Sequence, residues 1–166
     1  MDRLWAPWRM QYILSGDEAA DVCIFCKFPA DGPERHREHL ILHADEHAFV
    51  MLNKFPYSNA HVMVIPRAHV ADPAALDEKS WSATGIILQR SIAALRAAVS
   101  AHGFNVGMNL GRTAGAGIDQ HLHWHVVPRW NGDTNFMPVT GGVKVISEDL
   151  DGTWQRLRPH FEAISK

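Results

Sequence analysis

The sequence has 166 residues, of which 46% are apolar and 20% charged, and its formal net charge is -2. This length suits one domain with its own core, and without a basic excess we expect no nucleic-acid polymer as partner. We also expect a cytoplasmic protein without a membrane segment, because no apolar run reaches the roughly 20 residues that span a bilayer, no secretory signal opens the chain, and there are only two cysteines.

The first half of the chain predicts strands followed by a long helix. Residues 39–53, HLILHADEHAFVMLN, indicate two short strands separated by a polar turn near residues 44–46. Residues 61–66, HVMVIP, predict a third strand that ends at its proline. Apolar side chains recur at helical spacing from residue 77 to 102, and Gly103 stands where a left-handed C-terminal cap belongs.

The second half returns to strands. FNVGMNL, residues 104–110, predicts a strand, GRTAGAG, residues 111–117, a flexible turn, and HLHWHVVP, residues 121–128, the last core strand. Residues 147–164 have a helical pattern that Pro159 should kink or shorten. Strands joined by short connections, with one long helix packed across them, indicate an α+β domain.

Three histidines alternate with apolar residues in QHLHWHVVPRW, residues 120–130. On a strand His121, His123 and His125 would share one face, while the residues between them would face the other side. Neighbouring histidines would then stand roughly 6.6 Å apart along the strand, so all three could hardly converge on one metal ion.

Three interpretations of this row remain. The histidines could be tolerated beside a core, but burying three imidazoles without partners is costly. Two of them could hold a catalytic zinc ion with a third ligand elsewhere in the chain. We favour the third interpretation, in which one histidine attacks an electrophile while its neighbours orient it and stabilise charge.

The second motif is CIFC, with Cys23 and Cys26. It could be a redox pair, half of a zinc site or two buried small residues. A redox pair of this type usually lies in a βαβ unit, and the chain predicts none. A zinc site needs two more ligands, for which His61, His69 and His121 are available, and four nitrogen and sulfur ligands would close a structural site.

The loop GRTAGAG precedes the histidine row and follows Asn109. Small residues let backbone N–H groups approach an anion closely, so the loop could cradle a phosphate. It could also be an ordinary tight hairpin. The chain has no G-x-x-x-x-G-K-[ST] motif, which excludes a Walker-type nucleotide site.

These motifs together resemble the histidine triad (HIT) superfamily of nucleotide hydrolases and transferases. HLHWHVV fits its His-φ-His-φ-His-φ-φ signature. The likeness covers most of residues 4–146, which resemble the bacterial branch near diadenosine tetraphosphate phosphorylases and Fhit-type dinucleoside polyphosphate hydrolases. The stretches that carry it are, in order, LWAPWRMQYI, CIFC, MLNKFPYSNAHVMVIPRAHV, HGFNVGMNLG and HLHWHVVPRWNGDTNF.

The resemblance implies one HIT domain over residues 1–166, with a core near residues 22–130, an N-terminal arm and a C-terminal helical extension. The implied fold is an antiparallel sheet of about five strands with one long helix packed on it and a C-terminal helix. Family members are usually homodimers, so a homodimer is expected.

The resemblance also implies a reaction. The middle histidine, His123, would attack the α-phosphorus of an adenine nucleotide or dinucleoside polyphosphate and form an adenylyl-histidine. The backbone carbonyl of His121 would accept the Nδ1–H of His123, and His125 would bind the phosphates. Water as the second nucleophile makes a hydrolase, and inorganic phosphate as a second substrate makes a phosphorylase.

The supporting residues follow from the same resemblance. Asn53 matches a ribose- or phosphate-contacting position, His61 lies behind the catalytic row, and Asn109 would place its amide against the phosphate. For both asparagines, turn or strand-end chemistry is the alternative. No organic cofactor is implied, and the zinc ligands would be Cys23, Cys26, His69 and His121.

The chain departs from the family at one loop position. Many hydrolase-type members have Gln or Ser where this chain has Gly117, preceded by Ala116. A backbone N–H can still donate to phosphate there, but the choice between phosphorylase and hydrolase stays open. Trp130 matches phosphorylase-like members and would contact the second nucleotide or anchor a dimer interface.

Other functions remain compatible with these residues. The same fold could cleave nucleoside phosphoramidates or adenylyl sulfate, or act as a slow nucleotide-binding sensor. A hydrolase that uses the triad as zinc ligands is the remaining alternative, and it would place zinc at His123.

Overall fold

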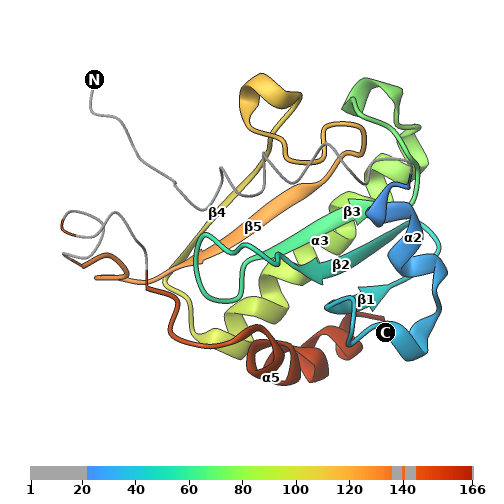
Figure 1. Cartoon of the computed structure of the whole chain (residues 1–166). Coiled ribbons are helices and arrows are strands. Elements are labelled where there is room, and N and C mark those ends of the chain that lie inside the picture. Colours follow the sequence, from blue (N-terminus) through green and yellow to red (C-terminus); the bar gives the residue numbers. More distant parts are fainter. Residues whose placement is uncertain (1–21, 136–139, 141–144, 166) are drawn as a thin grey trace.

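The computed structural model describes residues 22–135, 140 and 145–165. Its core is a five-stranded antiparallel sheet with the strand order β1-β2-β3-β5-β4 (Figure 1). The motif LWAPWRMQYI lies outside the described residues. The strands are β1 (Ile41–Ala44), β2 (Ala48–Leu52), β3 (Val62–Pro66), β4 (Gly103–Met108) and β5 (Trp124–Arg129).

The helices are α2 (Ile24–Ala30), α3 (Glu78–Val99) and α5 (Leu150–Glu162), with 3-10 turns at Pro33–Arg35, Pro73–Ala75, Arg112–Ala114 and Ala163–Ser165. Figure 1 shows α3 crossing one face of the sheet with α5 beside it, next to β1. The α+β fold predicted from the sequence, with a five-stranded antiparallel sheet, one long helix and a C-terminal helix, is confirmed. Among the described residues, no helix has the length and apolar character needed to span a bilayer.

Alternating side chains of the central strands build two cores. Val50, Val62 and Val64 face α3 and α5, where they pack with Leu95 and Phe161. The intervening residues face the opposite side, where Phe25 of α2 covers a smaller cluster completed by Ile41, Phe49, Met51, Met63 and Ile65. Because both faces are covered, β2 and β3 are buried throughout and consist of apolar residues.

The two ends of the long helix differ in how well the sequence predicts them. Asp77 caps the start of α3, since its carboxylate accepts the N–H of Ser80 at 2.9 Å. The predicted cap at Gly103 is wrong. Ser100 takes the left-handed conformation, with φ of 49°, and Gly103 is already the first residue of β4.

The C-terminal helix also runs further than Pro159 suggests, because α5 continues through the proline to Glu162. This helix covers the outer edge of β1. The indole N–H of Trp154 donates to the carbonyl of Ile41 at 3.0 Å, and Arg158 donates to the carbonyl of Leu42. Such contacts satisfy edge carbonyls that would otherwise be open to another strand.

Candidate active site and metal centre

The histidine row lies at the start of β5 rather than wholly within it. The strand begins at Trp124, so His121 and His123 occupy the segment just before it, whereas a strand from residue 121 was predicted. The expected division of side chains still holds. Leu122, Trp124 and Val126 belong to the core beneath α3, and the histidines lie on the opposite side; the residues that carry the proposed chemistry are therefore anchored by alternate apolar neighbours.

His123 is held in one tautomer. Its Nδ1 lies 2.9 Å from the backbone carbonyl oxygen of His121, so Nδ1 carries the proton and Nε2 carries the lone pair. The side chain is only 5% exposed. Burial lowers the pKa of His123, while the bond to the carbonyl of His121 opposes this. The ring is therefore neutral near pH 7, as a nucleophilic nitrogen must be.

His61 is buried behind the row, and its two nitrogens have distinct partners. Nδ1 accepts the backbone N–H of Tyr57 at 3.1 Å, so Nε2 must carry the proton. That Nε2 lies 3.0 Å from Nδ1 of His125, which therefore accepts. Burial, followed by the neighbouring His125 and His123, lowers the pKa of His61 to about 3. With His61 held neutral, His125 carries its own proton on Nε2 and can donate from there.

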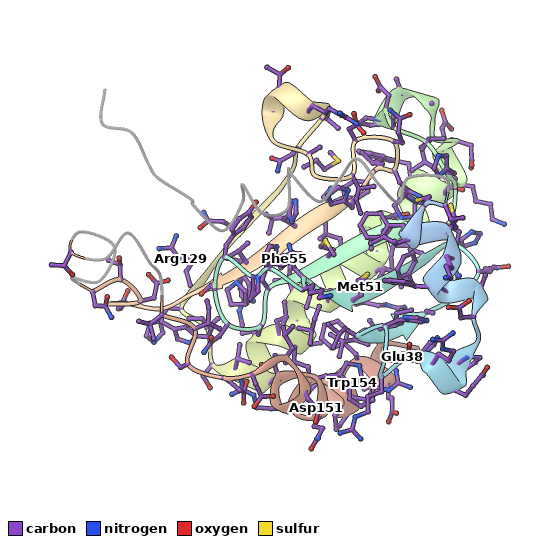
Figure 2. All side chains as sticks on the ribbon, in the orientation of Figure 1. Glu38, Met51, Phe55, Arg129, Asp151 and Trp154 are labelled. Carbon is purple, nitrogen blue, oxygen red and sulfur yellow. The ribbon has the colours of Figure 1, made fainter. Side chains whose placement is uncertain are left out.

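A cavity of about 490 Å³ opens beside the row, a volume within the roughly 300–1,000 Å³ of small-molecule sites. Its apolar half is lined by residues from α2, β2, β3 and the segment before the row: Ile24, Phe25, Phe28, Met51, Met63 and Ile118. The polar half is lined by the loop between β2 and β3, with Asn53, Lys54, Phe55 and Tyr57, and by Gly115, Gly117 and His125. Figure 2 shows Glu38 and Phe55 on opposite sides of Met51.

Contacts between rings establish the order of residues along this cavity. The ring centroids of Phe25 and His123 are 5.2 Å apart, those of His123 and His125 5.0 Å, and those of His125 and Tyr57 5.9 Å. The histidines thus lie between the apolar half and the loop that follows β2. An apolar group bound beside Phe25 would direct its polar remainder past His123 and His125.

The structure places Asn53 in the cavity wall, as the sequence suggests, and gives its oxygen a structural task. Oδ1 accepts the backbone N–H of Phe55 at 2.9 Å, and the N–H of Asn53 bonds to the carbonyl of His61 at 2.9 Å. The side-chain oxygen therefore holds the turn, and the NH₂ group is what Asn53 can offer to a ligand.

The glycine-rich loop contributes glycines rather than Ala116. Gly115 and Gly117 line the cavity, whereas Ala116 is buried and donates its N–H to the carbonyl of Gly111 at 3.2 Å. Gly111 and Gly115 have φ of 78° and 95°, which L side chains rarely adopt. Both glycines are thus needed for the loop to return toward the row.

Four of the predicted substrate residues do not line this cavity: His61, Asn109, Ala116 and Trp130. Asn109 is half-buried after β4. Trp130 donates its indole N–H to the carbonyl of Val99 at 3.1 Å, and so binds an otherwise unpaired carbonyl at the end of α3. Within the described residues of one chain, Trp130 thus belongs to the helix end and not to the histidine cavity.

The four predicted metal ligands do come together. One ligand atom from each of Cys23, Cys26, His69 and His121 lies within 4.8 Å of all the others. Sγ of Cys23 is 3.4 Å from Nδ1 of His121, and Sγ of Cys26 is 3.2 Å from Nδ1 of His69 and 3.6 Å from that of His121. Burial, and then the neighbouring Cys23 thiol, raise the pKa of the Cys26 thiol.

These distances fit a tetrahedral ion. Zn–S bonds of about 2.3 Å and Zn–N bonds of about 2.0–2.1 Å separate adjacent sulfur and nitrogen ligands by about 3.5 Å. His121 is also oriented for such a role. Its Nε2–H donates to the carbonyl of Pro66 at 2.9 Å, which fixes the lone pair on Nδ1, toward the cysteines.

Several cavity residues were not predicted from the sequence. The apolar half, with Phe25 and Phe28, forms because α2 packs its short apolar face on the sheet, and CIFC drew attention only to its cysteines. Lys54, Phe55 and Tyr57 were also missed. The signal was present, since NKFPY follows a buried strand directly and precedes His61 by a few residues.

Comparisons with known proteins agree with this geometry. Residues 34–132 match the HIT domain family. The chain is 35% identical over 160 residues to AP-4-A phosphorylase from Mycobacterium tuberculosis, an overlap of 92% of this chain and 80% of that protein. A Zn-bound histidine triad family protein from Mycobacterium smegmatis superposes with a TM-score of 0.67 at 25% identity, covering 89% of this chain and 98% of that one.

A hypothetical histidine triad nucleotide-binding protein from Sulfolobus tokodaii has a TM-score of 0.68 at 26% identity, covering 86% of this chain and 94% of that one. The family match spans more than half of the sequence and includes the whole histidine row. The chain therefore belongs to the HIT family of nucleotide hydrolases and transferases.

Proposed function

We propose that the protein cleaves dinucleoside polyphosphates such as diadenosine tetraphosphate through a covalent adenylyl-histidine on His123. The observation that carries the proposal is the bond from Nδ1 of His123 to the carbonyl of His121, which leaves the Nε2 lone pair as the nucleophile beside the cavity. The similarity to AP-4-A phosphorylase supports this class of substrate.

In the first step Nε2 of His123 attacks the α-phosphorus of the nucleotide bound in the apolar half. A P–N bond forms, and the P–O bond to the distal nucleotide breaks, so diadenosine tetraphosphate releases ATP. The imidazolium that results keeps its Nδ1–H on the carbonyl of His121, whose dipole stabilises the new positive charge. His125 donates its Nε2–H to the phosphate oxygens as their negative charge redistributes.

In the second step another nucleophile attacks the same phosphorus and releases His123. Inorganic phosphate gives ADP, and water gives AMP. Asn53 and the backbone of Gly117 line the same cavity and are proposed to hold phosphate or ribose oxygens there. The relative's name favours phosphate as the acceptor.

We further propose that Cys23, Cys26, His69 and His121 hold a structural zinc ion. Four protein ligands leave it no open position, so its contribution is to fix His121 and, through the His121 carbonyl, the ring of His123. The Zn-bound relative from Mycobacterium smegmatis supports this choice of metal.

A homodimer is proposed through the β4 edge. β1 is covered by α5, whereas β4 is the other end of the sheet and exposes Val106, with Leu110 exposed just beyond it. A second copy pairing with this edge would bury both side chains. Sedimentation velocity should show a dimer that Val106→Asp converts to monomer, and an unchanged dimer would contradict this interface.

The reaction is tested by product analysis with diadenosine tetraphosphate, with and without inorganic phosphate. ADP plus ATP, formed only with phosphate, establishes phosphorolysis, and AMP plus ATP under both conditions establishes hydrolysis. His123→Ala should abolish turnover while zinc content stays the same. Loss of zinc in this variant, or retained turnover, would overturn the assignment of His123 as nucleophile.

A further inference from the structure

We propose that the turn formed by residues 53–57, here called the 53–57 turn, is a second subsite that binds the leaving half of the substrate. Lys54 would bind its distal phosphates and Phe55 its second nucleobase. This inference rests on the proposed function, because it requires His123 to attack the phosphate that adjoins the first nucleoside.

The position of the turn follows from the order of rings along the cavity. Phe25 contacts His123, His123 contacts His125, and His125 contacts Tyr57, the last residue of the 53–57 turn. A nucleoside in the apolar half, with its phosphate at His123, therefore extends its remaining phosphates past His125 toward the turn. In Figure 2 Phe55 lies on the opposite side of Met51 from Glu38, which borders the apolar half.

The charges on the cavity wall agree with this direction. Among the described residues that line the cavity, Glu38 and Lys54 are the carboxylate and the ammonium group. Glu38 accepts two bonds from the guanidinium of Arg35, so its charge is already compensated. Lys54 forms no ion pair within the described part of the chain, and it lines the cavity at the turn toward which a polyphosphate would bring several negative charges.

Phe55 supplies an aromatic surface next to that charge. Its side chain is 47% exposed although the cavity has ample apolar surface elsewhere. The backbone of the turn is held at this residue, since the backbone N–H of Phe55 bonds to Oδ1 of Asn53 at 2.9 Å. Exposed aromatic rings beside a cation are typical stacking surfaces for nucleobases, and any of the bases can stack on them.

If the turn is a subsite, substitutions in it should change the Kd values of some ligands and not of others. A merely structural turn would not produce this difference. In the His123→Ala background, which prevents turnover, calorimetry measures the Kd values for AMP, adenosine 5′-tetraphosphate and diadenosine tetraphosphate. Adding Lys54→Ala should raise the Kd values of both tetraphosphates about tenfold and leave the Kd of AMP within twofold. Loss of a charge-assisted contact typically costs about this factor in affinity. Lys54→Arg should retain most of the affinity.

Adding Phe55→Ala instead should weaken diadenosine tetraphosphate about tenfold without affecting adenosine 5′-tetraphosphate, which lacks the second base. Phe55→Tyr keeps the ring and should bind like its parent. Lys79→Ala, an exposed lysine on α3 outside the cavity, is the matched control and should change none of the three constants.

The outcomes separate the two proposals. Equal weakening of AMP and the tetraphosphates by Lys54→Ala, or no weakening of either, would overturn the subsite. Failure of the protein with His123 intact to cleave diadenosine tetraphosphate would instead overturn the proposed reaction, while the binding constants in the His123→Ala background would still decide the subsite. Tenfold losses confined to the tetraphosphates, with Phe55 affecting only the dinucleoside, would support it.

Discussion

Nε2 of His61 lies 3.0 Å from Nδ1 of His125, and His61 is fully buried. Because Nδ1 of His61 already accepts the N–H of Tyr57, the proton between the two rings belongs to His61. The backbone of the loop after β2 thereby decides where His125 carries its proton. In the proposed reaction His61 would therefore act through His125, as a positioning residue.

Replacing His61 with Leu should reduce kcat about tenfold or more, since His125 can then place its proton on either nitrogen. His61→Gln keeps a side-chain N–H near the position of Nε2 and should retain more of the rate than Leu. Steady-state kinetics across pH 5.5–8.5 check this. If His61 has a purely structural role, the kcat values of both variants should fall equally and the pH profile of kcat should stay unchanged.

The lowered pKa of His61 also predicts a loss of stability in acid. Its pKa is about 3 in the folded chain and about 6.5 when unfolded. Between these values the unfolded chain binds a proton that the folded chain does not, so stability is complete above pH 6.5 and falls as the pH drops, by up to about 1.4 kcal/mol per pH unit. Urea unfolding of the unmodified chain and His61→Gln at pH 7.5, 6.5 and 5.5 isolates this contribution. Parallel pH dependences would contradict it.

Cys26→Ser should remove the proposed zinc ion. Cys26 supplies one of four ligand atoms and lies closest to His69, so its loss opens the site. A zinc content near zero and a melting temperature lowered by roughly 10 °C are expected, since about 3 kcal/mol of metal-linked stability has that effect in a chain of this size. His123→Ala is the matched control and should keep one zinc ion per chain. Full zinc content in Cys26→Ser would refute the ligand set.

Trp154→Phe should lower the free energy of unfolding by about 1 kcal/mol, the usual net contribution of one hydrogen bond. The substitution keeps a six-membered aromatic ring but removes the five-membered ring whose N–H binds the carbonyl of Ile41. Urea denaturation measures the change. Gln155→Ala, on the exposed side of α5, is the control, for which a change below about 0.5 kcal/mol is expected. Equal losses in both variants would show that the bond to Ile41 contributes nothing.

Much of the fold could be predicted because periodicity reports burial. The fully apolar run of β3 and the helical spacing of α3 both place side chains against the sheet, and both elements are found where expected. The helix end was mispredicted because Ser100 takes a left-handed conformation that glycine usually provides. Pro159 does not end α5, because Leu157 and Phe161 on either side of it in the sequence pack in the core.

The site was predictable where one short motif carries the chemistry. The bond from His123 to the carbonyl of His121 joins residues two apart, so the resemblance could imply it. The resemblance also implies that His61 lies behind the row, but its bond to His125 spans 64 residues and depends on how β3 pairs with β5. The direction of the Trp130 side chain was unpredictable for the same reason, because its partner Val99 lies at the end of a helix that precedes β4.

Because α5 covers the edge of β1, that edge stays uncovered during synthesis until α5 has been made. All five strands leave the ribosome before Trp154 and Arg158 do, so a nascent chain can complete its sheet while the carbonyls of Ile41 and Leu42 are still exposed. During that interval the edge can pair with other chains. Translation that stops short of α5 should therefore yield chains that aggregate even though every strand is present.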